Sequence, residues 1–191
     1  MVTRCSWCST DPIYQDYHDL EWGQPLHQEH LLFEMLCLEG QQAGLSWLTV
    51  LKKRRHYRLH FFQYPIEYIA QISDAELELK LQDSGLIRHL GKLSAIRDNA
   101  LAWQAMKAKG FELPKWLWQF SGQQPVCNRV NQDYPVATQT NASVAMSTAL
   151  KQHGFKFVGP TICYAFMQAV GMVNDHDDEC HFKYATTHRS S

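Results

Sequence analysis

Apolar side chains recur at helical intervals along most of this chain. Leucines and methionines between positions 31 and 38 predict a buried helix over residues 30–38, which we expect to break at Gly40 and Gly44. The same spacing predicts a helix after Ser46, which can cap it, and another over residues 92–109 that ends at Gly110. Alternating strand-like segments are scarce. The pattern therefore predicts an all-α protein.

Capping signals add further helices. Ser73 with Glu76 forms a capping box at the start of a helix that Gly85 would close, and Ser143 can cap a helix ending near Gly154. Three more segments complete the prediction: a short turn at 116–120, a helix over 162–170, and an ordered loop or link between lobes at 122–141.

Length and composition fit one globular domain. The chain has 191 residues, of which 45% are hydrophobic, enough for a sizeable core. We expect a single domain over residues 1–185, built of two helical lobes with a cleft between them. Residues 186–191 are expected to form a disordered tail.

Charge and cysteine use limit the location and the partners. No signal peptide or membrane-spanning segment is evident, and six scattered cysteines do not resemble a secreted disulfide framework. We therefore expect a cytoplasmic protein with reduced thiols and no membrane partner. A net charge of −1 gives no general attraction to nucleic acid, so an anionic partner must be held locally.

Residues of the metal-binding type stand near both ends of the chain. Cys5 and His18 lie near the start, and His176 and Cys180 are separated by three residues, which would put them on one face of a helical turn. Thiolate and imidazole suit tetrahedral zinc, and four protein ligands would leave no open position for catalysis. Such a site would be structural. Cys8 leaves an alternative open, because Cys5 and Cys8 have Cys-x2-Cys spacing.

Aromatic residues are dense near the N-terminus. Trp7, Tyr14, Tyr17 and Trp22 fall within sixteen residues and could line a slot for a flat ring. The alternative is an apolar patch that docks the N-terminal segment. If His18 binds a metal ion, the adjacent Tyr17 is held rigidly, and the metal site would then support a pocket wall.

Glu39 ends an apolar run and precedes a glycine, so its carboxylate could lie at the floor of a cleft. Burial would raise its pKa, whereas a nearby cation would lower it. The alternative is a surface glutamate at a helix end. Trp47 could stack in the same cleft or pack in the core.

Two segments could contact phosphate. The turn at Gly159–Pro160, followed by a helix from Thr161, would present backbone N–H groups at a helix N-terminus. An ordinary connector between helices is the alternative. The basic run over residues 52–58 is either a solvated helix face or a track for a phosphate backbone.

Several segments together resemble one known family. They are Tyr17-His18-Asp19, Glu21-Trp22-Gly23, residues 38–47, residues 49–54, residues 154–168 and residues 173–176. Over residues 4–180 the chain resembles the DNA-3-methyladenine glycosylase I family, a zinc-binding branch of the helix-hairpin-helix DNA glycosylases.

The resemblance implies a fold, an activity and a metal. It implies an all-α helix-hairpin-helix architecture and one structural zinc ion held by Cys5, His18, His176 and Cys180, with Cys8 outside the ligand pattern. It also implies hydrolysis of the N-glycosidic bond of 3-methyladenine in alkylated double-stranded DNA, during base excision repair. The free base would leave, and an abasic site would remain.

The resemblance also implies roles for individual residues. Glu39 is the expected catalytic residue, although whether it activates water or only recognises the base stays open. The expected base-binding residues are Tyr17, Trp47, Tyr14, Trp7 and Trp22. The expected DNA contacts are Gln42, Leu45, Gly159, Thr161 and Lys156, with Gln42 or Leu45 filling the gap left by the extruded base.

Further expectations concern the reaction and the partners. Asp175 adjoins a metal ligand and is expected to play a supporting role at most. Strand-nicking relatives carry a lysine where this chain has Cys163, so we expect hydrolysis without strand cleavage. The resemblance implies a monomer that needs no nucleotide cofactor.

Two other function classes remain open from the residues alone. One is a nucleic-acid-binding module without catalysis. The other is a zinc hydrolase or deaminase, against which a complete set of four protein ligands argues.

Overall fold

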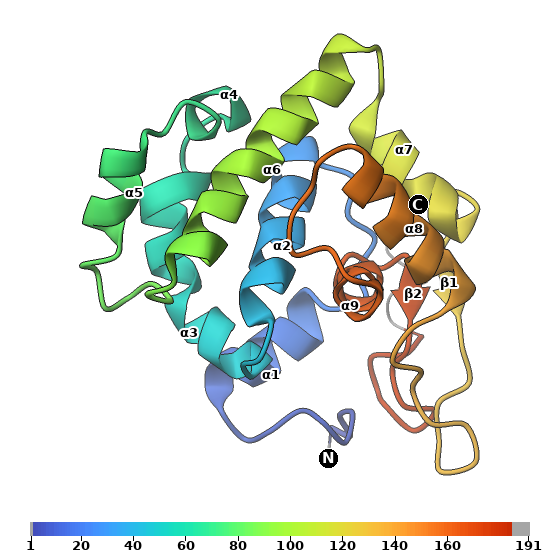
Figure 1. Cartoon of the computed structure of the whole chain (residues 1–191). Coiled ribbons are helices and arrows are strands. Elements are labelled where there is room, and N and C mark those ends of the chain that lie inside the picture. The colour runs from blue at the N-terminus through green and yellow to red at the C-terminus, as the bar shows by residue number, and fades with distance from the viewer. Residues whose placement is uncertain (1, 185–191) are drawn as a thin grey trace.

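The computed structural model describes residues 2–184 and is mostly helical (Figure 1). The predicted tail at 186–191 lies outside the described residues. The helices are α1 (Pro12–Leu20), α2 (Glu29–Gln42), α3 (Trp47–Tyr57), α4 (Ile66–Ile69), α5 (Asp74–Lys80), α6 (Leu90–Ala108), α7 (Leu113–Trp118), α8 (Asn141–Gln152) and α9 (Pro160–Ala169). A π-helical turn, η1 (Arg58–Phe62), continues α3, and a 3-10 turn, η2 (Gln119–Ser121), continues α7. The predicted all-α fold is confirmed.

The remaining regular structure within residues 2–184 is one small sheet. Strand β1 (Val126–Cys127) pairs in parallel with β2 (Val173–Asn174). The segment predicted as a loop at 122–141 thus contains one short strand and the start of α8. None of the helices between residues 2 and 184 combines the length and apolar composition that a membrane-spanning helix requires.

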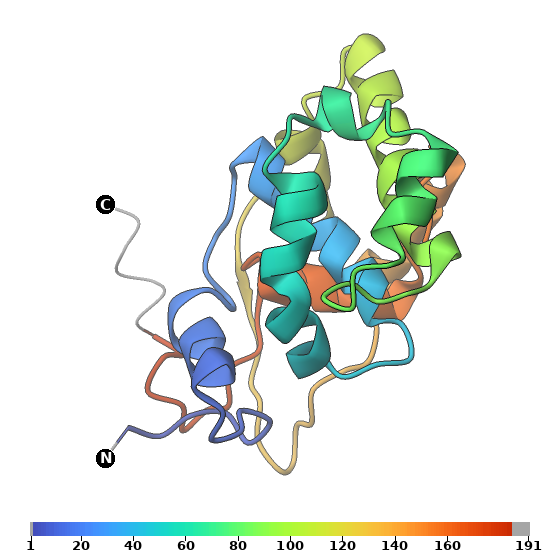
Figure 2. The ribbon, with the colours of Figure 1, turned by 90° about the vertical axis from the view of Figure 1, so that its left-hand side faces the viewer.

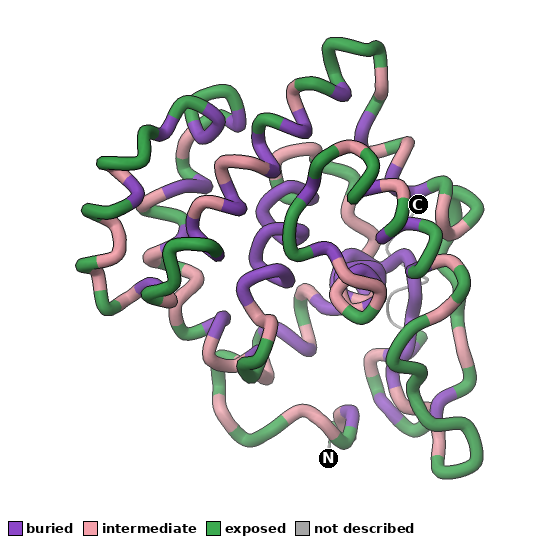
Figure 3. Tube along the Cα trace, in the orientation of Figure 1, coloured by how far each residue is buried: buried purple, intermediate pink, exposed green. Residues whose placement is uncertain are grey.

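Helix α2 lies at the centre of the molecule. It contacts α3, α6, α7 and α9, and every residue from Leu32 to Gln41 is buried. Figure 3 shows the long buried stretch of this helix surrounded by more exposed elements. A helix covered on all sides can carry a polar side chain into the interior, which is what Glu39 does.

Gly40 does not break α2, contrary to the sequence-based prediction. It lies inside the helix, where a Cβ atom would stand 3.1 Å from Phe157 Cβ and 3.2 Å from the Phe157 carbonyl oxygen. Glycine is therefore needed there for the close approach of another segment. Gly44, at φ +76°, is the residue that breaks the chain after α2.

Local capping signals were partly right. Ser46 caps α3, and Ser73 with Glu76 forms the predicted capping box of α5. Helix α5 ends at Lys80, however, five residues before Gly85. Ser143 is the third residue of α8 rather than its cap, because Thr140 caps that helix and Ser143 completes the box. Helix α1, capped by Asp11, was not predicted.

Helices α8 and α9 pack against each other around a tight connection at residues 153–159. Gly154 adopts φ +92°, and the Ser147 hydroxyl donates to the Val158 carbonyl at 2.6 Å. Asn99 of α6 binds this connection through two hydrogen bonds. It accepts from the Lys156 N–H at 2.7 Å and donates to the Lys156 carbonyl at 3.3 Å. The two helices and their turn form the hairpin expected from the sequence.

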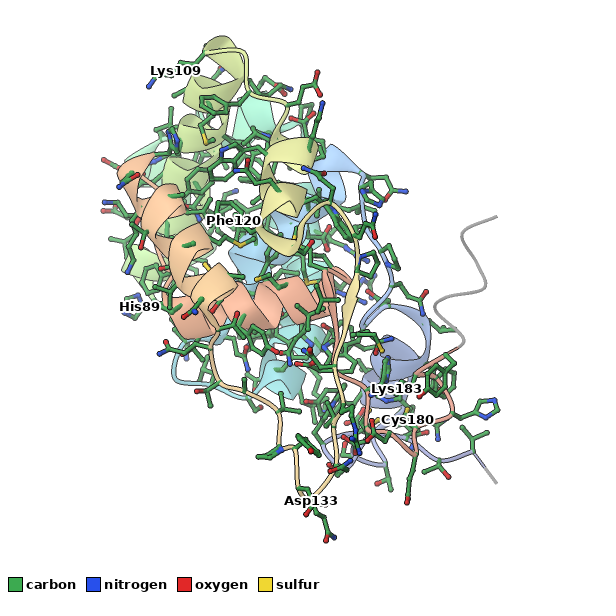
Figure 4. The ribbon with its side chains drawn as sticks, turned by 90° about the vertical axis from the view of Figure 1, so that its right-hand side faces the viewer. His89, Lys109, Phe120, Asp133, Cys180 and Lys183 are labelled. Atoms are coloured by element: carbon green, nitrogen blue, oxygen red, sulfur yellow. The ribbon has the colours of Figure 1, made fainter. Side chains whose placement is uncertain are left out.

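The N-terminal and C-terminal segments run side by side, away from α4 and α5 (Figure 2). The His181 N–H donates to the Thr3 carbonyl at 2.9 Å, and the Ser6 N–H donates to Asp177 Oδ2 at 2.7 Å. Figure 4 shows Cys180 and Lys183 at this end of the molecule, with Asp133 at the tip of the long loop nearby.

Candidate functional site

A cavity of about 360 Å³ opens beside the end of α2. Its walls come from the N-terminal segment, α1, α2, α3, α9 and the loops near residues 136 and 177. The lining residues are Ser6, Trp7, Tyr14, Tyr17, Trp22, Glu39, Gln42, Trp47, Val136, Ala165, Gln168 and Asp177. The five aromatic residues predicted to bind a base all line this one cavity, together with Glu39 and Gln42.

Glu39 is a buried acid facing the cavity. The residue is 2% exposed, and within residues 2–184 its Oε2 atom has no hydrogen-bond partner. Burial raises the pKa of its carboxyl to about 8. The alternative of a surface glutamate is therefore wrong. A buried, unpaired carboxyl is costly, so it points to a partner that the cavity receives from outside.

Trp47 and Tyr17 form the wall next to Glu39. Trp47 is the first residue of α3, placed there by the Ser46 cap, and its Nε1 is also without a hydrogen-bond partner among the described residues. The two rings lie 5.5 Å apart, tilted by 52°. Burial, followed by the charge of Glu39, raises the pKa of Tyr17 well above its usual value. Tyr17 is thus a neutral ring and hydroxyl at neutral pH.

A second wall is built from the N-terminal aromatic residues. The Trp7 ring centroid lies 4.8 Å from that of Trp22 and 5.1 Å from that of Tyr14. The N-terminal segment therefore docks through these rings, as the alternative reading supposed, and the docked rings also line the cavity. The two readings of this aromatic cluster are compatible.

Gln168 was missed by sequence reasoning. It projects from α9 into the cavity, and its Nε2 donates to Asp175 Oδ2 at 2.8 Å. Asp175 also accepts from Tyr164 at 2.6 Å and from Asn128 at 2.7 Å. Asp175 thus positions Gln168 and anchors the loop near residue 128, which fits a supporting role. A lone glutamine late in a helix gives no pattern that could have singled it out.

Cys5, His18, His176 and Cys180 form a buried cluster next to the cavity. Cys5 Sγ and Cys180 Sγ lie 3.3 and 3.4 Å from His176 Nδ1, and Cys180 Sγ lies 3.6 Å from His18 Nε2. Sulfur and nitrogen ligands of one tetrahedral zinc ion are separated by about 3.5 Å. The four side chains therefore fit a metal site that joins the two ends of the chain.

The surroundings of this cluster also fit a metal ion. His18 Nδ1 lies 2.8 Å from Asp19 Oδ1, and His176 Nε2 lies 3.4 Å from the Trp22 carbonyl oxygen. The outer nitrogen of each ring thus has an acceptor, which leaves the inner nitrogen free to bind a metal. Burial lowers the pKa of His176 to about 4, so this imidazole is neutral, as a ligand must be.

Two details of the metal-site prediction change. Cys8 lies outside the cluster, with its Sγ 3.9 Å from the Tyr14 carbonyl oxygen, so it does not replace a histidine. The sequence predicts a helical turn for His176 and Cys180, but the structure has no helix there. The Cys180 N–H donates to the Asp177 carbonyl at 2.8 Å, which closes a tight turn instead.

The cluster also supports the cavity wall. The Trp22 ring centroid lies 4.6 Å from that of His176, edge to face, and the Trp7 centroid lies 5.2 Å from that of His18. Two rings of the cavity therefore rest directly on two of the four candidate ligands. A metal ion held there would fix these rings without contacting the cavity itself.

The combination of a buried acid, an aromatic cavity and a clamp between the chain ends has close counterparts among known proteins. The family model described as methyladenine glycosylase matches residues 7–184. The chain belongs to this family. A DNA-3-methyladenine glycosylase 1 of Escherichia coli (strain K12) is 50% identical over 179 residues, covering 94% of this chain and 96% of the relative.

Solved structures agree with this family assignment. A crystal structure of 3-methyladenine DNA glycosylase I superposes with a TM-score of 0.91 at 51% identity, covering 94% of this chain and 98% of that one. A variant of 3-methyladenine DNA glycosylase I in complex with 3-methyladenine gives a TM-score of 0.88 at 34% identity, covering 94% and 97%. The protein is thus a DNA-3-methyladenine glycosylase by class, a hydrolase of N-glycosyl bonds.

Within this methyladenine glycosylase fold, the predicted DNA contacts lie in two places. Gln42 lines the cavity, and Leu45, which is 41% exposed, follows it on the turn after α2. Gly159, Thr161 and Lys156 instead lie on the α8–α9 hairpin and do not line the cavity. Gly159 is the N-cap residue of α9, and Lys156 and Thr161 are exposed.

Most of the basic run after Ser46 is engaged within the protein. Lys52 pairs with Asp11 at 2.8 Å, and Arg54 donates to both carboxylate oxygens of Glu21 at 2.6 Å. Arg58 pairs with Glu34 at 2.8 Å. These contacts join α3 to α1 and α2, so the run functions first as internal support for the glycosylase fold.

Proposed function

We propose that this methyladenine glycosylase holds the flipped 3-methyladenine in the cavity between Trp47 and the N-terminal rings, with Glu39 as its polar contact. The observation that supports this is the buried, unpartnered Glu39 carboxyl surrounded by aromatic rings. A base within a duplex must leave the helical stack before an enzyme can reach its glycosidic bond, and a poorly paired damaged base leaves at lower cost.

The cavity suits a cationic purine. Methylation at N3 gives adenine a positive charge while it is still attached to the sugar, so the aromatic rings provide cation–π attraction. That charge also lowers the pKa of Glu39 from about 8, so the carboxyl ionises as the base binds. A carboxylate accepts from the exocyclic amine of adenine, whereas guanine presents an acceptor oxygen there, and adenine is preferred.

The proposed reaction is hydrolysis that leaves an abasic site and an intact strand. Glu39 is the proposed catalytic residue, stabilising the charge that develops as the glycosidic bond breaks. Cys163, which stands where strand-nicking relatives carry a lysine, is fully buried, and burial raises the pKa of its thiol to about 12. A buried neutral thiol is a poor nucleophile, so no covalent attack on the sugar is expected from it.

The metal is proposed to be one structural zinc ion bound by Cys5, His18, His176 and Cys180. Zinc would provide cross-linking of the chain ends, and four protein ligands would leave no position for substrate. Gln42 or Leu45 is proposed to fill the gap in the duplex, while Gly159, Thr161 and Lys156 are proposed to hold phosphate at the N-terminus of α9.

The remaining expectations belong to the same proposal. They are a monomer, one domain over residues 1–185 made of two lobes, a cytoplasmic location, double-stranded DNA as partner, and no nucleotide cofactor. Each is consistent with an enzyme that scans a duplex with one face and uses water as its second substrate.

The decisive experiment is base release from methylated duplex DNA, analysed by chromatography of the free bases. We expect free 3-methyladenine from the wild-type protein, a loss of roughly 100-fold or more in rate for Glu39→Gln, and unchanged affinity of that variant for undamaged duplex. Glu67→Gln, which changes an exposed glutamate on α4, is the matched control and should release base normally.

Two outcomes would contradict the proposal. Equal base release by wild type and Glu39→Gln would remove Glu39 from the chemistry, and DNA binding without release by the wild type would favour a binding module. Strand integrity is measured on the same samples, because cleavage without heat or base would refute the hydrolysis-only reaction.

A further inference from the structure

A second cluster of metal-binding side chains lies apart from the four-ligand cluster and from the cavity. It consists of His56, His60 and Asp83, all partly exposed, and shares no residue with either site. His56 Nδ1 and His60 Nε2 each lie 2.8 Å from the same atom, Asp83 Oδ2. Neither the family assignment nor the base-binding cavity gives these three residues a role.

Three elements bring the cluster together. His56 is in the last turn of α3, and His60 is in the π-helical turn η1 that continues it. Residues four apart on a helix share a face, so both rings point toward the loop between α5 and α6. That loop carries Asp83. Two histidines at this spacing, with a carboxylate opposite, form a common metal-binding arrangement.

The loop between α5 and α6 fixes the orientation of the Asp83 carboxylate. The second oxygen of Asp83, Oδ1, accepts a hydrogen bond from the Gly85 N–H at 2.7 Å. Lys53 of α3 donates to the Ser84 carbonyl at 2.5 Å and to the Leu86 carbonyl at 3.3 Å, which ties the loop to α3. The hydrogen bond to Oδ1 fixes the direction in which the carboxylate presents Oδ2 to the two imidazoles, in the way that outer contacts orient metal ligands.

Gly85 gives the His56 ring its position. A Cβ atom at residue 85 would lie 2.1 Å from His56 Nδ1, so any other residue would push the imidazole away from Asp83. The hydrogen bond from His56, followed by those from Gly85 and His60, also holds the pKa of Asp83 well below its usual range. The carboxylate is therefore ionised whenever the imidazoles are neutral.

We propose that His56, His60 and Asp83 form a second metal site, which binds a divalent transition ion of the zinc type. Two imidazole nitrogens and one carboxylate oxygen are a suitable ligand set for such an ion. The side chains are 43%, 31% and 25% exposed, so water can complete the coordination shell. Bound ions would exchange with solvent more readily than at the buried cluster.

The geometry requires only a small adjustment. Ligand atoms of a tetrahedral zinc ion are separated by about 3.3 Å when each is about 2.0 Å from the metal. The present separations of 2.8 Å are those of hydrogen bonds, so the rings must open by about half an ångström. Partly exposed side chains at a helix end allow this, and the ion then replaces two hydrogen bonds with three coordination bonds.

An ion at this site would connect α3 and η1 to the loop between α5 and α6. The site is not part of the cavity, so it is expected to affect stability rather than base release. This expectation separates the inference from the proposed function, because each is tested by a different readout.

The test is equilibrium dialysis of the full-length protein, purified with its buried cluster loaded, against buffered Zn²⁺. We expect the wild type to bind one more equivalent of zinc than His60→Gln or Asp83→Asn, whose affinity for that equivalent should fall at least about tenfold. His153→Gln, which changes a partly buried histidine at the end of α8, is the matched control and should bind like the wild type.

Thermal unfolding provides the second measurement. Added Zn²⁺ should raise the melting temperature of the wild type and of His153→Gln, and should leave that of His60→Gln unchanged. Base release should be the same in all four proteins. Equal zinc binding by the wild type, His60→Gln and Asp83→Asn, or an equal thermal shift in the wild type and His60→Gln, would overturn the proposal.

Discussion

At the scale of single residues, Glu39 is the clearest conflict between stability and function. A carboxyl at a fully covered position normally has a hydrogen-bond or charge partner, yet Oε2 of Glu39 has none within residues 2–184. Folding therefore favours its protonated form, and the pKa rises to about 8 from the ordinary 4.5. The cost of this burial should be measurable as a dependence of stability on pH.

We expect Glu39→Gln to become more stable relative to the wild type as pH rises. The folded protein binds a proton at Glu39 that the unfolded chain has released, so the wild type loses stability between about pH 4.5 and about pH 8. Glutamine does not ionise and shows no such loss. The difference in unfolding free energy should change by on the order of 3 kcal/mol between about pH 5 and pH 8, as measured by denaturant titration.

Glu34→Gln is the matched control for this pH effect. Glu34 is also buried on α2, but its carboxylate pairs with Arg58 at 2.8 Å. Removing it breaks a pair and should destabilise the protein at both pH values. If the unfolding free energies of Glu39→Gln and Glu34→Gln changed with pH in the same way, the conclusion that Glu39 has no partner in the folded protein would be wrong.

At the scale of elements, the residues where α2 meets the α8–α9 hairpin determine how closely the two can pack. Phe157, at the turn of the hairpin, adopts φ +54°, a conformation that side-chain-bearing residues rarely take. Its carbonyl and Cβ face Gly40. Helix α2 thus carries Glu39, the proposed catalytic residue, immediately before the glycine that the hairpin contacts.

Gly40→Ala should destabilise the protein by up to about 2 kcal/mol, the difference between a steric cost of about 1–3 kcal/mol and a gain in helix propensity. The steric cost arises because the added methyl group meets the Cβ and the carbonyl oxygen of Phe157, which move only with the backbone. The gain in helix propensity, about 1 kcal/mol, is smaller than this steric cost at its upper range. The measurement is thermal or denaturant unfolding, with base release followed in parallel because the hairpin must move away from α2.

Gly91→Ala provides the comparison in another helix. Gly91 lies in α6, where the nearest atom to an added Cβ is Cε1 of the exposed His89 side chain. This variant should be neutral or more stable by up to about 1 kcal/mol. If Gly40→Ala were more stable than the wild type, the hairpin would be able to move away from α2 without a loss of stability.

Asn99→Ala should loosen the hairpin without altering the cavity. Asn99 makes both hydrogen bonds to the backbone of Lys156, so its loss should cost about 1–3 kcal/mol in unfolding free energy and weaken binding to duplex DNA. Lys156→Ala removes only the exposed side chain. It should change stability by less than about 0.5 kcal/mol while lowering DNA affinity, and no effect on binding would remove Lys156 from the DNA contacts.

The elements that could be predicted from sequence are those fixed by their own residues. Ser46 and Ser73 cap the helices that follow them, and these caps depend on side chains only a few positions away. Gly40 was misread because its role depends on Phe157, more than a hundred positions later. Helix α8 begins earlier in the chain than predicted, because Thr140 rather than Ser143 is its N-cap residue.

At the scale of the whole molecule, the cluster of Cys5, His18, His176 and Cys180 joins the two ends of the chain. Removing the metal with a chelator should lower the melting temperature and increase amide exchange in residues 2–20 and 173–184, while α2 and α6 stay protected. Base release should fall as Trp7 and Trp22 lose their support. Chelation that stopped release without changing stability or exchange would indicate a catalytic metal instead.

Cys8→Ser and Cys180→Ser form the matched pair for this prediction. Cys8 lies outside the cluster, so its variant should keep one metal equivalent and a near-normal melting temperature. Cys180→Ser removes one of the four candidate ligands and should not retain a metal ion. Equal metal content in the two variants would contradict the assignment of the ligands.

More of the site than of the helix boundaries could be predicted from the sequence, because the main site residues lie in short recognisable segments. Glu39, the five aromatic residues and the four candidate ligands meet in or beside one cavity. Gln168 and Val136 could not be found, since each enters the cavity alone from a distant element. The internal pairing of the basic run with Asp11, Glu21 and Glu34 was likewise invisible, because it depends on how α1, α2 and α3 meet.

The spacing of the four-ligand cluster also sets an order of events during protein synthesis. Two of the candidate ligands, His176 and Cys180, are translated more than 150 residues after the other two, Cys5 and His18. A nascent chain leaving the ribosome can form α2, α3 and α6 early, but Trp22 gains its contact with His176 only after residue 176 has left the ribosome. The aromatic wall of the cavity is therefore completed only after residue 180 has been made, and a chain that terminates before that point lacks it.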